Sequence, residues 1–157
     1  MPEISSSQLT GSQSDSFRKA KDAVSRQNWD YILMLIPPIL EAHPGFLEGR
    51  KILRAAQIAK TKSASSLEKS MAGVKIAPLL LAAKAAAGKS LGAALAKIEE
   101  ALGVDPANSQ ANAALAELAL GNDFPGTAIF AHETVRAAKP QDTANLHGLA
   151  RAYIASK

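Results

Sequence analysis

The sequence predicts an all-α fold built from antiparallel helix pairs, and three observations support this class. Hydrophobic residues make up 47% of the 157-residue chain, aromatic residues only 4%, and much of the hydrophobic fraction is alanine. Small side chains of this kind suit helices that pack closely along their lengths. Pro106 and Pro140 lie 34 residues apart, and Leu81 and Leu115 keep the same offset. This spacing is the length of one helix–turn–helix repeat.

Caps and helix breakers divide the chain into a tail and nine expected helices. Residues 1–15 are rich in serine and poor in apolar groups, so we expect a disordered N-terminal tail. Asn28, Ser65 and Ser90 are predicted N-caps. A double proline at 37–38 predicts a kink or a restart in the second helix. The expected helices begin at 16 and then span about 29–42, 46–60, 66–72, 77–87, 91–103, 109–120, 125–138 and 143–155.

These helices pair into an array with one shortened member. Pro44 ends a first repeat and lies 62 residues before Pro106, whereas two full repeats would need 68. The short helix at 66–72 explains the deficit. We therefore expect a single domain over 16–157 whose repeats span about 13–46, 47–74 (degenerate), 75–108 and 109–142, followed by a solvating cap at 143–157.

The segment 75–108 resembles the tetratricopeptide repeat (TPR) family. The matching residues are Leu81, Ala82, Gly88, Ala94, Ala101, Leu102, Asp105 and Pro106. The segment 109–142 matches less well, because His132 and Val135 replace the usual aromatic residue and alanine. The resemblance implies a right-handed superhelix of helix pairs that holds another protein and carries no chemistry of its own.

The same resemblance implies which side chains line a concave groove, since the first helix of each TPR pair faces it. In 75–108 these positions are Ile76, Leu79, Ala83 and Ala86. In 109–142 and the last helix, the groove would present Gln110, Ala113, Glu117, Leu120, Ala144, His147, Arg151 and Ile154. Gln110, Glu117, His147 and Arg151 are therefore predicted partner-binding residues.

Positive charge is concentrated in the N-terminal half. Residues 1–75 hold 11 basic and 7 acidic residues, whereas residues 76–157 hold 7 of each. The run 50–62 contains five basic residues and no acid: Arg50, Lys51, Arg54, Lys60 and Lys62. Such a patch attracts acidic partners, so we predict that these five residues bind a partner. The alternative interpretation is a solvated helix face without a partner.

A narrower resemblance concerns the stretch Ile36-Pro37-Pro38 through Lys51, which is similar to bacterial kinesin-light-chain-like TPR proteins. That family accompanies bacterial tubulins, so the resemblance implies binding to acidic tubulin filaments. A generic TPR scaffold in another complex remains an alternative. A module that binds nucleic acid or an anionic membrane is a further alternative, weakened for nucleic acid because Phe46 is the only aromatic residue near the basic run.

The sequence indicates a non-enzymatic protein without a metal or cofactor. The run 88–90 reads Gly-Lys-Ser, but Ala83 stands where a phosphate-binding loop needs another glycine. The chain has no cysteine, and no metal-ligand spacing links His43, His132 and His147. No signal peptide or membrane span is recognisable, so we expect a cytoplasmic protein.

Overall fold

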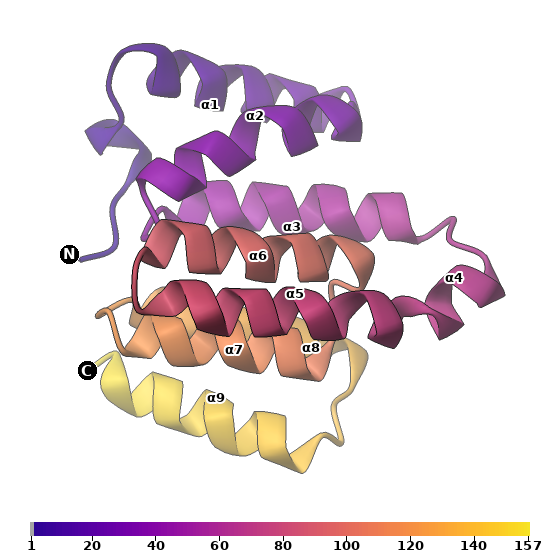
Figure 1. The fold of residues 1–157 in the computed structure, drawn as a ribbon. Coiled ribbons are helices and arrows are strands. Elements are labelled where there is room, and N and C mark those ends of the chain that lie inside the picture. The colour runs from indigo at the N-terminus through magenta and orange to yellow at the C-terminus, as the bar shows by residue number, and fades with distance from the viewer. Residues whose placement is uncertain (1) are drawn as a thin grey trace.

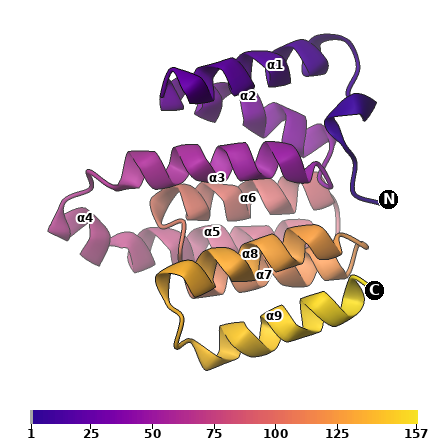
Figure 2. The ribbon, with the colours of Figure 1, turned by 180° about the vertical axis from the view of Figure 1, so that it is seen from behind.

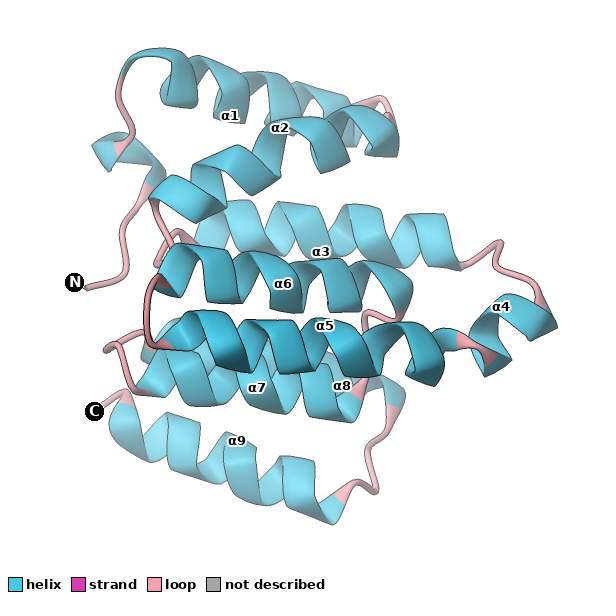
Figure 3. Ribbon diagram, viewed as in Figure 1, coloured by secondary structure: helices cyan, strands magenta, loops and turns pink. Residues whose placement is uncertain are grey.

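A computed structural model describes residues 2–157, which form nine α-helices and one 3-10 turn at Ser6–Gln8. Consecutive long helices pack side by side, and no strand is present in these residues apart from an isolated bridge between Ile4 and Phe46 (Figures 1 and 3). The predicted all-helical class is confirmed. The helices are α1 Gly11–Ser25, α2 Trp29–Ala42, α3 Leu47–Thr61, α4 Ser66–Ser70, α5 Ala72–Ala87, α6 Leu91–Val104, α7 Ser109–Leu120, α8 Pro125–Ala138 and α9 Thr143–Ala155.

The predicted N-caps are confirmed by their hydrogen bonds. The Asn28 side chain accepts from the Tyr31 N–H at 3.3 Å, and the Ser90 hydroxyl accepts from the Ala93 N–H at 3.2 Å. Ser65 and Glu68 form a reciprocal capping box at the start of α4. Each cap satisfies a backbone donor that has no intrahelical acceptor.

Two predicted helix breaks are absent. α2 continues through Pro37 and Pro38 without restarting, and both prolines lie on its exposed side. Gly73 was expected to stop the helix before α5, but α5 already begins at Ala72 and contains Pro78 in its interior. A proline removes one donor and crowds the preceding turn, and neither effect prevents a helix whose opposite face is well packed.

The predicted disordered tail is wrong for residues 2–15; Met1 lies outside the described residues. Glu3 accepts hydrogen bonds from the N–H of Gly126 at 3.1 Å and from the N–H and hydroxyl of Thr127. These groups form the N-terminus of α8, where free donors and the helix dipole favour a carboxylate. Leu9 is buried, and α1 starts at Gly11. A few anchors therefore offset the ordering cost that composition alone suggested.

The stack of helices is irregular at its shortened member. α4 is a single turn and lies at the edge of the molecule, so α3 has no full-length partner after it (Figures 1 and 2). α6 packs against α2 and α3 as well as against α5 and α7. Consequently α5, whose main neighbour is α6, lies on the outer side, opposite α3 and α8 (Figures 1 and 2).

Two hydrophobic cores result. The first belongs to α1, α2 and α3 and includes Phe17 and Phe46, whose rings meet edge-to-face with centroids 4.8 Å apart. The second belongs to α5 through α9 and is built largely from alanine and leucine. A polar cluster from α3, α6 and α7 lies between the two cores.

Candidate protein-interaction surface

The structure contradicts the surface position predicted for Arg50 and Arg54. Their exposed fractions are 0% and 2%, because α3 turns them toward α6 and α7. Leu53 and Gln57 share this buried face at helical spacing, so the arginines belong to a core stripe. The basic run was interpreted as one polar surface, whereas two of its five members point inward. The spacing of these four residues was the signal that sequence reasoning missed.

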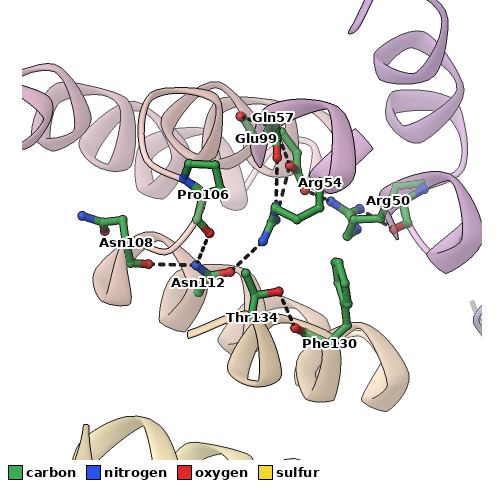
Figure 4. Close-up of polar contacts among 10 residues, drawn as sticks. Arg50, Arg54, Gln57, Glu99, Pro106, Asn108, Asn112, Phe130 and Thr134 are labelled. Carbon is green, nitrogen blue, oxygen red and sulfur yellow. Dashed lines mark hydrogen bonds and ion pairs between the residues drawn. The ribbon is translucent and has the colours of Figure 1, made fainter. Parts of the chain in front are cut away.

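Arg50 is held by partners from two parts of the chain (Figure 4). Its Nη1 donates to Glu99 Oε1 on α6, and its Nη2 donates to the carbonyl of Pro44 at 2.8 Å. Gln57 Nε2 also donates to Glu99 Oε2 at 3.2 Å. These bonds fix α3 against α6.

Arg54 extends the same cluster to the C-terminal helices (Figure 4). Its Nε donates to Gln57 Oε1 at 2.8 Å, and its Nη1 donates to Asn112 Oδ1 on α7 at 3.0 Å. Its Nη2 lies 3.6 Å from Glu99 Oε2, and the guanidinium lies 5.4 Å from the centre of the Phe130 ring. Arg54 therefore joins α3 to α6, α7 and α8.

Electrostatics in this cluster favour the ionised forms, and burial opposes them. Burial disfavours the charged carboxylate of Glu99, but the two guanidinium groups and the bond from Gln57 outweigh it and lower the pKa below its ordinary value. Burial also lowers the pKa of Arg54, an effect that Glu99 partly offsets. The cluster is sealed from solvent, so its role is to join the two halves of the molecule.

The lysines of the predicted patch remain at the surface. Lys51, Lys60 and Lys62 are exposed, and Lys60 forms a 2.9 Å ion pair with Asp30 on α2. An open pocket of about 630 Å³ lies between the ends of α3 and α6 and the start of α5. It is lined by three lysines, Lys60, Lys69 and Lys75, together with polar and small residues.

The predicted groove residues have different outcomes. In α5, Ile76 and Ala83 are 2% and 3% exposed and pack in the core, so they line no groove. On α7 and α9 the predicted residues Gln110, Glu117, His147 and Arg151 are all exposed. Their side chains form no hydrogen bond or ion pair with the described residues. The structure therefore leaves them accessible on two neighbouring helices without assembling them into a site.

The outer face of α5 is apolar although it faces solvent. Val74 and Leu81 are 68% and 70% exposed, and Met71 at the start of the helix is 44% exposed. Together with the exposed Pro78 and Ala85 they form one row, here named the α5 stripe. A helix that is apolar all round is normally buried all round, so the α5 stripe is an unusual surface for an uncovered helix.

The next repeat provides an internal comparison. Pro78, Leu81 and Ala85 of the α5 stripe correspond, 34 residues later, to Asn112, Leu115 and Ala119 of α7. These three α7 residues are all 0% exposed, because α7 packs against α6, α8 and α9. Equivalent repeat positions are thus covered in α7 and open in α5.

Basic side chains flank the α5 stripe on both sides. Lys75 and Lys84 are the only charged residues of α5, and their positions on the helix place them on opposite edges of the row. Lys69 of α4 lies close to its N-terminal end. The candidate interaction surface therefore combines an apolar row with a uniformly positive border.

Comparisons with protein-family models, with curated proteins and with solved structures found no match to this chain. Among the helices of residues 2–157, none has both the length and the apolar character needed to cross a membrane. The interpretation of the surface therefore depends on its own geometry.

Proposed function

We propose that the protein is a non-enzymatic helical adaptor of the TPR type that binds an acidic protein surface. The observation that carries this proposal is the α5 stripe, an apolar row in the open with lysines on both edges. Exposed apolar rows rimmed by charge are characteristic of protein-binding surfaces. The 34-residue offset between α5 and α7 and the paired helices support the TPR assignment.

An acidic filament of the bacterial tubulin type is the specific partner that we propose. Support comes from the exposed lysines that surround the open pocket near α4, namely Lys60, Lys69 and Lys75. Arg50 and Arg54 have no part in this contact, since they are buried. Positive charges at the rim of an interface steer an acidic partner toward it.

Co-sedimentation with bacterial tubulin filaments tests this proposal. The variant Lys60→Glu/Lys69→Glu/Lys75→Glu should bind filaments about tenfold more weakly than wild type, as expected from three surface contacts of about 0.5 kcal/mol each. The control variant carries the same charge change at distant exposed sites: Lys19→Glu, Arg26→Glu and Lys157→Glu.

The control should pellet like wild type. Equal loss in both variants would show that net charge alone matters, and this would remove the site assignment. No pelleting of the wild type would exclude the filament. Retention on duplex DNA, with a steep dependence on salt, would replace the proposal by a nucleic-acid module.

A further inference from the structure

We infer that the α5 stripe is the seat of a partner's amphipathic helix that carries acidic residues along both of its edges. This inference rests on the proposed adaptor function and names the partner's form and chemistry. It concerns the outer face of α5, not the groove that the TPR resemblance implies.

The spacing of the α5 stripe fits a helix better than any other shape. Its members Met71, Val74, Pro78, Leu81 and Ala85 are separated alternately by three and four residues. This is the seam by which two helices pack along their lengths. The row is about 21 Å long at 1.5 Å per residue, which matches four turns of a partner helix.

The fold itself shows what covers this face elsewhere. The equivalent positions of α7, including Leu115 and Ala119, are buried by other helices of the chain. The helix that would precede α5 in a regular array is reduced to the single turn α4. α5 therefore has the packing face of a repeat helix without the neighbour that a full-length repeat would supply. A partner helix would complete it.

Charge selects a partner with acidic edges over a second copy of this chain. Lys75 and Lys84 border the α5 stripe, and α5 carries no carboxylate. Two copies of α5 would bring four lysines to one seam without a compensating acid. Glutamates on the edges of a partner helix would instead face these lysines, as charges flanking a helical seam do.

Composition argues against a lipid surface as the occupant. Residues 71–87 include no tryptophan, tyrosine or phenylalanine, the residues that anchor helices at a membrane interface. An interfacial helix also presents its polar face to water, whereas the opposite face of α5 packs on α6 through Ile76 and Ala83.

The test uses the full chain and a synthetic probe. The probe is a 21-residue peptide of three heptads with leucine at the two seam positions and glutamate at the flanking positions. A second peptide has lysine in place of each flanking glutamate. Binding of each fluorescent peptide is measured by anisotropy in titrations with the wild type and two variants.

The test variant Val74→Gln/Leu81→Gln removes the apolar row, whereas the control Met34→Gln/Ile154→Gln changes two apolar residues on α2 and α9. The exposed fractions are 68% and 70% for the first pair and 62% and 72% for the second. We expect the wild type and the control variant to bind the glutamate peptide equally. The test variant should bind it at least tenfold more weakly, and the lysine peptide should bind the wild type at least tenfold more weakly than the glutamate peptide.

Several results would overturn the inference. They are no binding of the glutamate peptide, equal binding of both peptides, or equal losses in both variants. A dimer of the wild type that the test variant abolishes would identify a second copy as the occupant. Binding to phosphatidylserine vesicles that the test variant abolishes would identify a membrane. Filament pelleting without peptide binding would remove only this inference, whereas loss of both would also remove the adaptor proposal.

Discussion

Glu99 is the single buried carboxylate among residues 2–157, and it faces two buried guanidinium groups, those of Arg50 and Arg54. Desolvation of three charges is costly, and it is offset here by hydrogen bonds to Gln57 and Asn112 as well as by the ion pairs. The cluster therefore specifies how α3 meets α6 and α7 more than it adds stability. Removing its one negative charge leaves two like charges in a closed space.

We predict that Glu99→Gln lowers the free energy of unfolding by about 3–5 kcal/mol, because it leaves buried charges without their counterion. Urea denaturation followed by circular dichroism measures this change. Arg54→Met should cost less, since it leaves the Arg50–Glu99 pair intact. A larger loss in Arg54→Met than in Glu99→Gln would contradict the role assigned to the carboxylate.

The pH dependence provides the control for the same residue. Glu99 keeps its proton off in the folded protein to a pKa below its ordinary 4.5, whereas the unfolded chain titrates near that value. The ion pairs therefore contribute fully above pH 4.5, and this contribution is lost as the pH falls through the lowered folded-state pKa. Wild type should lose stability in this acid range, and Glu99→Gln should lose distinctly less.

At the scale of elements, the N-terminal segment ties the two ends of the chain together. Glu3 caps the N-terminus of α8, Ile4 pairs with the loop at Gly45, and Ser6 donates to Glu48. The segment thus spans from the first core to the C-terminal helices. Its order depends on a small number of specific contacts.

We predict that Glu3→Ala lowers the free energy of unfolding by about 1 kcal/mol, the usual effect of losing an N-cap. Amide hydrogen exchange should also become faster at Ile4 and at Gly126–Thr127. The matched variant Glu41→Ala, on the exposed side of α2, should change neither quantity. Unchanged exchange at Thr127 in Glu3→Ala would contradict the capping role.

Local signals predicted most elements because their causes are local. Asn28, Ser65 and Ser90 cap helices through bonds to residues three positions away, so sequence alone identifies them. Glu3 meets Thr127 across most of the chain, and no local pattern reveals such a contact. Gly73 weakens a helix but does not stop one that packing on α6 supports.

For the whole molecule, the decisive feature is the position that α6 occupies. The repeat spacing predicts an ordered stack in which each pair covers the next. Instead α6 packs on α2 and α3, where the missing partner of α3 would lie, and α5 stays outside. Sequence periodicity describes helices one after another, so it does not reveal that a helix from a later repeat fills this place.

The candidate surface was accordingly only partly predictable. Lys51, Lys60 and Lys62 were predicted at the surface and are exposed, whereas Arg50 and Arg54 are buried by long-range partners. The α5 stripe was not predicted, because Leu81 matches a position that regular repeats cover. Its exposure follows from the arrangement of all the helices.

The most direct measurement compares Leu81 with its repeat equivalent Leu115 in a chain that contains no native cysteine. Single variants Leu81→Cys and Leu115→Cys are reacted with a small maleimide under native conditions. L81C should react within about tenfold of an unstructured peptide, whereas L115C should react about 1,000-fold more slowly, because its labelling requires a local opening of several kcal/mol. Equal protection at both positions, or rapid reaction of L115C, would contradict an open α5 stripe beside a covered α7.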